Sequence, residues 1–242
     1  QKINIITGWI TFLIALVVYT LTVEPTASFW DCGEFIATSY KLEVPHPPGA
    51  PFFLLMGRMF SLFAGDNVEQ VAFWVNMLSV LSAAFTVLFL FWSITHLAKK
   101  MLVKAGDVLN TGQTIAVMGA GLVGGLVCTF SDSIWFSAVE AEVYAMSSFF
   151  TAFVFWAILK WETINDESDH NKWLILIAYM MGLSIGVHLL NLVTIPALGL
   201  IVYFKYVEKI TPKGVFLTLL TSGAIIIAVL IGVIPGIPST VG

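Results

Sequence analysis

The sequence predicts an all-α polytopic membrane protein with about seven transmembrane helices and short interfacial helices in its first outer loop. Of its 242 residues, 58% are hydrophobic and only 11% are charged, whereas a soluble domain carries about 25% charged residues. Apolar runs long enough for a helix to cross the hydrocarbon, about 20 residues, recur along the chain. These runs lack the polar and apolar alternation of barrel strands, so we expect helices.

The spans follow from the positions of the apolar runs. We predict spans at residues 4–22, 70–97, 113–131, 143–161, 173–188, 190–206 and 214–234. The shorter apolar run 52–63 begins among prolines, which suits an interfacial or re-entrant helix. We expect residues 1–242 to form a single transmembrane domain. Because the chain starts with Gln and stops just after an apolar run, we expect it to be the N-terminal part of a longer chain.

The charge distribution predicts the orientation of the spans. Alternating loops place nine of the 11 lysine and arginine residues on the side of the N-terminus and nine of the 15 acidic residues on the other. Positive residues favour the cytoplasm, so the N-terminus is predicted to be cytoplasmic. Segments 24–69 and 131–142 and the hinge at His188 then share the outer face. The chain has no basic stripe for nucleic acid, and its two cysteines form no metal-type spacing.

The first outer loop collects five titratable residues between two apolar spans. Charged groups beside hydrocarbon are costly unless they face water, a partner or a substrate. The loop therefore indicates a site, and its titratable residues are Asp31, Glu34, Glu43, His46 and Arg58.

Asp31 and Glu34 are three residues apart, so a helical turn would place both carboxylates on one face. Two carboxyls at a low-dielectric border are expected to push one pKa upward, which suits a general base near neutral pH. The same spacing also fits two acids that cap an interfacial helix or bind water.

His46 and Arg58 are candidates for binding an anion. The sequence His46-Pro47-Pro48-Gly49 predicts a stiff turn that fixes the direction of the imidazole, although a solvated histidine in a structural turn would look the same. Arg58 is the only arginine in the chain. Its guanidinium suits either a pair of phosphate oxygens or the anchoring of a lipid headgroup.

Further candidates lie near the second outer segment and the hinge. Glu140 and Glu142 are two residues apart, so on a helix they would diverge and at most one would face Asp31. They could instead be acidic charges favoured by the dipole at a helix N-terminus. His188 and Asn191 could face a substrate or bridge helices through hydrogen bonds.

Two motifs carry a resemblance to a known superfamily. Asp31 and Glu34 within Phe-Trp-Asp-Cys-Gly-Glu-Phe (29–35), followed by His46-Pro-Pro-Gly, resemble the first outer loop of the GT-C membrane glycosyltransferases. That superfamily includes the protein O-mannosyltransferases. Segments 29–51, 135–144 and 182–191 are similar to a bacterial polytopic family formerly of unknown function, which is related to an animal endoplasmic-reticulum protein O-mannosyltransferase.

The resemblance implies an inverting glycosyltransferase. It would move a mannose-like sugar from a polyprenyl-phosphate donor to a hydroxyl acceptor, protein Ser/Thr or glycan, on the non-cytoplasmic face. Asp31 would deprotonate the acceptor and Glu34 would assist or orient. The Asp-Glu pair that is adjacent in protein O-mannosyltransferases is split here, so the identity of the base stays open between the two acids. The membrane would be the bacterial inner membrane with a periplasmic site, or else the endoplasmic reticulum.

The resemblance also suggests how the substrates are held. His46 and Arg58 would hold the donor phosphate, and the remaining candidates for substrate binding are Glu140, Glu142 and His188. The resemblance implies a lipid-linked sugar donor and no further definite cofactor. The acids leave room for a divalent metal such as Mg²⁺ or Mn²⁺, but the first loop offers too few sure ligands, so no metal site is predicted.

Two other function classes remain open at this point. A transporter or lipid flippase would be expected to carry charges in mid-span and to have two similar halves. Spans beyond 173 are uncharged through the middle, and residues 1–120 do not resemble 121–242. A non-catalytic subunit of an envelope complex would use the fold as a scaffold for a stable partner. The expected partners are membrane lipid, the lipid-linked donor and the acceptor, and nucleic acid is not expected.

Overall fold

The computed structural model describes residues 1–47, 49–104, 107–164 and 167–233. Every regular element in these ranges is helical, which confirms the predicted all-α class. In chain order the elements are α1 (Lys2–Thr22), α2 (Cys32–Lys41), α3 (Pro51–Ser61), η1 (Leu62–Ala64), η2 (Val68–Gln70), α4 (Val71–Leu102), α5 (Thr111–Thr129), α6 (Asp132–Ala138), α7 (Val143–Glu162), α8 (Glu167–Ile185), η3 (Leu189–Thr194), α9 (Ile195–Tyr206), α10 (Pro212–Ala228) and η4 (Val229–Val233).

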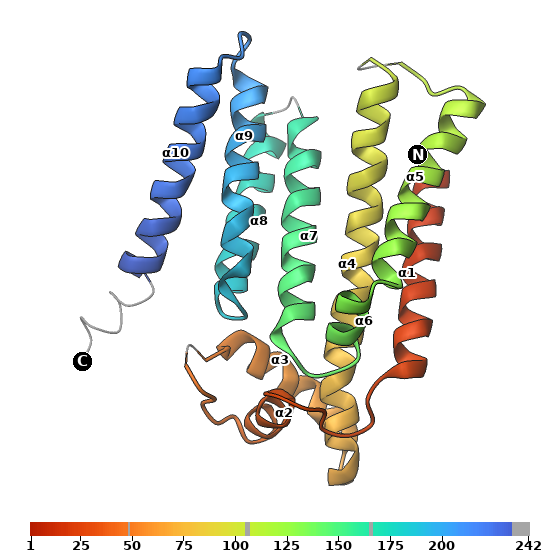
Figure 1. The fold of residues 1–242 in the computed structure, drawn as a ribbon, viewed down its shortest axis with the longest axis vertical. Coiled ribbons are helices and arrows are strands. Elements are labelled where there is room, and N and C mark those ends of the chain that lie inside the picture. Colours follow the sequence, from red (N-terminus) through yellow and green to blue (C-terminus); the bar gives the residue numbers. More distant parts are fainter. Residues whose placement is uncertain (48, 105–106, 165–166, 234–242) are drawn as a thin grey trace.

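The long helices lie side by side and alternate in direction, and α2, α3 and α6 gather at one end of the bundle (Figure 1). We call this end, formed by residues 23–47, 49–70, 130–142 and 186–194, the lower end. Main-chain hydrogen bonds join its segments: Glu24 N–H donates to the Val139 carbonyl (2.9 Å), and the N–H groups of Phe52 (2.7 Å) and Phe53 (3.4 Å) both donate to the Gly186 carbonyl. The segments that the charge argument placed on one face therefore do lie together.

Within the part of the chain that the structure describes, six helical segments are long and apolar enough to cross a membrane. They are Lys2–Thr22, Val68–Leu102, Thr111–Thr129, Val143–Glu162, Leu189–Tyr206 and Pro212–Gly232. They match six of the predicted spans, although residue 234 of the last prediction lies outside the described residues. This makes the chain a multi-pass membrane protein with about six candidate spans.

The predicted span 173–188 does not reach this standard. Residues 173–185 of this prediction fall in α8, and residues 186–188 lie beyond the end of that helix. The first two turns of α8 carry Asp169 and Lys172, so its apolar part is shorter than the about 20 residues that a span needs. Helix α8 nonetheless lies beside α7 and runs antiparallel to it (Figure 1). The alternation of loops between the two ends is therefore kept.

Helix α4 is the centre of the bundle, because α1, α5 and α7 all pack against it. At the lower end, Phe35 of α2 and Phe53 of α3 join Val75 of α4 in one buried cluster. Burying an aromatic side chain of this size contributes about 1.5–3 kcal/mol. The apolar run 52–63 is found as α3 and η1, a short helical segment as predicted. This packing fixes α2 and α3 against the ends of the long helices.

The contact between α4 and α5 depends on Gly121. A Cβ atom there would lie 2.7 Å from the ring of Phe91 on α4, whereas a Cβ at Gly119 would meet nothing within 4 Å. Gly121→Ala should therefore destabilise the protein by about 1–3 kcal/mol through overpacking. The measurement is thermal unfolding of the detergent-solubilised protein. Gly119→Ala is the matched control and should leave stability unchanged or slightly raised, and equal unfolding midpoints for the two variants would contradict the packing argument.

Candidate functional site

The N-terminus of α2 carries the two acids of the first loop. Asp31 is the residue before the helix and Glu34 lies in its first turn. The helix ends at Lys41, and the next residue, Leu42, adopts a left-handed conformation with φ 54°. The Glu43 N–H then donates to the Thr38 carbonyl. The chain thereby reverses along α2 and returns His46 to the end where the helix began.

His46 contacts Glu34 twice and faces Asp31. Its Nδ1 lies 2.8 Å from Glu34 Oε2, and its main-chain N–H donates to Glu34 Oε1 at 2.7 Å. Its Nε2 lies 3.9 Å from Asp31 Oδ2. Both carboxylate oxygens of Glu34 are thus engaged by one residue, so Glu34 orients the imidazole, whereas no hydrogen bond from the described residues occupies the carboxylate of Asp31. We call these three residues the acid–histidine cluster.

The hydrogen bonds of the cluster move two pKa values in opposite directions. The side-chain and main-chain hydrogen bonds from His46 lower the pKa of Glu34. The hydrogen bond to Glu34, with the charges of Glu34 and Asp31, raises the pKa of His46. The expected upward shift from two neighbouring acids is therefore wrong for Glu34, because a histidine rather than a second carboxylate is its nearest partner.

Glu142 supplies the raised carboxyl pKa instead. Glu140 and Glu142 lie in the non-helical link before α7, so the helical geometry assumed for them from sequence is wrong. Glu142 is 7% exposed, and burial, with the charges of Asp31 and Glu140, raises its pKa to about 7. Burial also raises the pKa of Glu140, whose side chain bonds Ser28 and which is affected by the charge of Glu24. Glu142 is therefore the acid of this pair that faces Asp31.

The acid–histidine cluster has the composition of a metal site. One ligand atom from each of Asp31, Glu34 and His46 can be chosen so that all lie within 4.8 Å of one another, and all three residues are exposed. Carboxylate oxygens with an imidazole nitrogen suit several divalent ions. Because Glu34 already holds His46, the Nε2 of His46 and the carboxylate of Asp31 are the ligand atoms that remain free.

Arg58 lies away from the cluster. Its guanidinium donates to the Tyr40 carbonyl (2.8 Å) and to Ser61 Oγ (3.4 Å), and it lies over the Tyr40 ring. Tyr40 is nine residues beyond Asp31, about 13 Å along the axis of α2. The structure therefore places Arg58 at the C-terminal end of α2, where it ties that end to α3.

His188 lies at the lower end, as expected, beside the Glu142 segment. Its Nδ1 accepts a hydrogen bond from the Leu190 N–H, its ring centroid is 5.5 Å from that of Tyr144, and burial lowers its pKa. The predicted bridge between helices is made by Asn191, which bonds Ser184 of α8 and Thr151 of α7.

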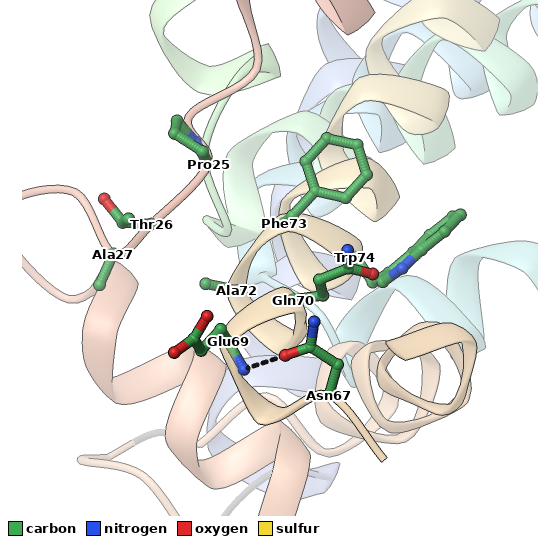
Figure 2. A pocket seen from close by; sticks show the side chains of 9 residues that line it. All are labelled: Pro25, Thr26, Ala27, Asn67, Glu69, Gln70, Ala72, Phe73 and Trp74. Carbon is green, nitrogen blue, oxygen red and sulfur yellow. Dashed lines mark hydrogen bonds between the residues drawn. The ribbon is translucent and has the colours of Figure 1, made fainter. Parts of the chain in front are cut away.

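A groove of about 950 Å³ lies at the lower end, between residues 25–27 and the start of α4 (Figure 2). Phe73 and Trp74 line it together with the polar side chains of Asn67, Glu69 and Gln70. Its wall reaches the first turn of α2, because a Cβ at Gly33 would lie 3.7 Å from the Ala27 Cβ. The groove thus adjoins the helix that carries Glu34.

One polar residue near the site was missed by the sequence analysis. Asn76 is fully buried on α4, and its side chain bonds the carbonyls of Glu24 and Thr26 and the thiol of Cys32. The available signal was a carboxamide inside a predicted span, where polar side chains are costly and often functional. Nothing in the sequence indicated its partners, which are 44 to 52 residues away.

The fold and the site define a multi-pass membrane protein with an acid–histidine cluster at one end of its helical bundle. Comparison of sequences then assigns the family. The chain belongs to the family described as the N-terminal domain of the protein O-mannosyl-transferase TMEM260, which matches residues 31–211 and so includes the cluster.

Two curated relatives agree with this assignment. The chain is 28% identical over 169 residues to the protein O-mannosyl-transferase TMEM260 of Mus musculus, covering 69% of this chain and 21% of the relative. It is 26% identical over 146 residues to the protein O-mannosyl-transferase tmem260 of Dictyostelium discoideum, covering 58% of this chain and 15% of the relative. The aligned region is thus about a fifth or less of each relative's length. No solved structure matches the chain.

The Glu34–His46 contact predicts a measurable shift on mutation. Glu34→Gln should lower the pKa of His46 towards its ordinary value of about 6.5, because the partner that stabilises the imidazolium loses its charge. The pKa can be followed by NMR of labelled histidine and assigned with His46→Gln. Glu43→Gln, which changes an exposed acid of the same loop, is the control. An unchanged His46 pKa in Glu34→Gln would show that the contact is not formed.

The same contact predicts the pH range in which it stabilises the fold. Because the pKa of His46 is raised, its contribution to the free energy of unfolding is complete below about pH 6.5. This contribution is lost as the pH rises through the raised pKa. Because the pKa of Glu34 is lowered, its contribution to the free energy of unfolding is present above about pH 4.5. This contribution is lost as the pH falls through the lowered pKa. The difference in stability between wild type and Glu34→Gln should therefore be largest between these limits.

Glu142 predicts the opposite dependence on pH. Its raised pKa means that the native protein keeps this proton to higher pH than the unfolded chain, so stability falls as pH rises from about 4.5 to about 7. Glu142→Gln removes this cost and should be more stable than wild type at pH 8 by about 2 kcal/mol, but not at pH 4.5. The measurement is denaturant unfolding at both pH values. Parallel pH profiles for the two proteins would contradict the burial of an ionisable Glu142.

Proposed function

We propose that this protein is an inverting glycosyltransferase that moves a mannose-like sugar from a polyprenyl phosphate to a hydroxyl acceptor on the non-cytoplasmic face. Membership of the O-mannosyl-transferase TMEM260 family supports a glycosyltransferase activity. The observation that carries the proposal is the acid–histidine cluster at the lower end, where a lipid-linked donor would be met at the membrane surface.

The geometry of the cluster suggests a separate role for each residue. In the reaction, the acceptor oxygen forms a bond to the anomeric carbon while the bond from that carbon to the phosphate oxygen breaks, and its electron pair leaves with the phosphate. Asp31, which keeps a free carboxylate, would take the proton of the acceptor hydroxyl. Glu34 would orient His46, as its two hydrogen bonds to that residue imply.

His46 is the better-placed of the two proposed phosphate ligands. Its raised pKa favours an imidazolium near neutral pH, which would stabilise the charge that develops on the leaving phosphate. Arg58 is held by the Tyr40 carbonyl at the far end of α2 and would have to leave that bond to reach the same phosphate. His188, whose ring contacts Tyr144, is proposed to line the substrate site. Glu142, which faces Asp31, is proposed to line it as well, with Glu140 behind them.

The groove in Figure 2 is a suitable place for the acceptor. It adjoins the first turn of α2, and its aromatic and carboxamide side chains offer both stacking surface and hydrogen bonds to a protein or glycan. We propose the bacterial inner membrane with a periplasmic site as the location, with the endoplasmic reticulum as the alternative. If transfer instead requires a divalent ion, the carboxylate of Asp31 and the Nε2 of a neutral His46 are its proposed ligands, with the ion in place of the imidazolium at the phosphate. EDTA should then stop transfer reversibly.

Asp31→Asn tests the proposed base. The variant preserves size but cannot accept the proton, so transfer from a polyprenyl-phosphate sugar should fall by at least about 100-fold while the protein still inserts. Transfer is measured in proteoliposomes with a radiolabelled donor, and Glu34→Gln should show a smaller loss. Glu43→Gln should retain activity as the matched exposed acid. Normal turnover by both Asp31→Asn and Glu34→Gln would overturn the assignment, and solute uptake without transfer would favour a transporter.

A further inference from the structure

The segment that leads to Asp31 has little apolar packing of its own. Residues 23–31 form no regular helix, and the side chains just before Asp31 are exposed: Phe29 is 84% and Trp30 87% exposed. Trp30 also has a φ of 61°, a conformation that is uncommon outside glycine and is kept only when surrounding contacts impose it. Some other contact must therefore hold this segment in place.

Asn76 provides that contact from the centre of the bundle. Its Nδ2 donates to the carbonyls of Glu24 (2.6 Å) and Thr26 (3.0 Å), and its Oδ1 lies 3.8 Å from the Cys32 thiol, which donates to it. One side chain thus binds Glu24 and Thr26 in the first half of this segment and Cys32 directly after it. The partners in these three hydrogen bonds all lie outside helix α4.

Cys32 lies where three parts of the chain meet. Besides Asn76, its thiol contacts the main chain of Ser28 and of Ala141, and it is fully buried. The hydrogen bond from Glu24 to Val139 closes the same junction. The segment is therefore fixed both to α4 and to the link that carries Glu142, which faces Asp31.

We propose that Asn76 is a positioning residue: its buried carboxamide fixes segment 24–32 and thereby places Asp31 opposite His46 and Glu142. The same bonds fix residues 25–27, which form one wall of the groove in Figure 2. The placement itself is independent of any activity, whereas its effect on turnover rests on the proposed function.

The placement can be tested through the thiol of Cys32, the neighbour of Asp31. In a Cys128→Ala background Cys32 is the only cysteine in the sequence, and its reaction with a maleimide in detergent should be slow. Asn76→Asp keeps the size and the acceptor but sets a carboxylate against two carbonyl oxygens. The substitution should speed labelling by at least about tenfold, which corresponds to a decrease of about 1.4 kcal/mol in the free energy of exposing the thiol.

Ser82→Ala is the matched control, because Ser82 is also buried on α4 but its hydroxyl donates to the Leu78 carbonyl of its own helix. It should label as slowly as the parent protein. Asn76→Ala is the second variant and should label as fast as Asn76→Asp. Thermal unfolding checks that all three are folded at the labelling temperature. Slow labelling in both Asn76 variants, or fast labelling in Ser82→Ala as well, would overturn the proposal.

A kinetic measurement separates positioning from a general loss of structure. Asn76→Asp should lower kcat for sugar transfer about tenfold while the KM for the lipid-linked donor stays within about twofold, because a displaced Asp31 affects the chemical step. Faster labelling without a loss of kcat would show that Asn76 holds the segment but not the base, which overturns the positioning role. A parent protein that protects Cys32 from labelling yet transfers no sugar would refute the proposed function. In that case, the labelling rates of the Asn76 variants alone would test whether Asn76 positions the segment.

Discussion

The two hydrogen bonds between Glu34 and His46 are the contact on which the candidate site depends. They join residues 12 positions apart and bring the turn after α2 back to the start of that helix. These bonds direct the imidazole at Asp31, so the charges of Asp31, Glu34 and His46 lie close enough to affect one another. Without this contact, Asp31 would be an isolated acid at the end of a helix. The sequence was also compatible with that simpler role, in which the acids cap the helix or bind water.

The membrane explains why the polar residues gather where they do. A bundle whose long helices are apolar can carry exposed charge only at its ends, since charges within hydrocarbon are costly. Helices α2 and α3 and the link before α7 occupy the lower end (Figure 1), and they carry the acid–histidine cluster and Glu142. The fold thus brings together acids from two loops more than 100 residues apart in the sequence.

The sequence predicted most of the fold and part of the site. Apolar runs located the spans because their length is set by the hydrocarbon thickness, but α8 fell short because Asp169 and Lys172 occupy its first turns. The spacing of Asp31 and Glu34 predicted a shared face. It could not predict that His46 would occupy both oxygens of Glu34, since that depends on the reversal of the chain at Leu42. Arg58 differs from expectation, and Asn76 was missed, for a similar reason: their partners are set by packing rather than by spacing.

The prolines around His46 give its amide a particular importance. Residues 45, 47 and 48 are prolines, which have no N–H, so the only main-chain donor between Val44 and Gly49 belongs to His46. That single donor goes to Glu34 rather than to another peptide group. The hairpin-like return of the chain is therefore tethered by a carboxylate, and one glutamate governs both the path of the backbone and the aim of the ring.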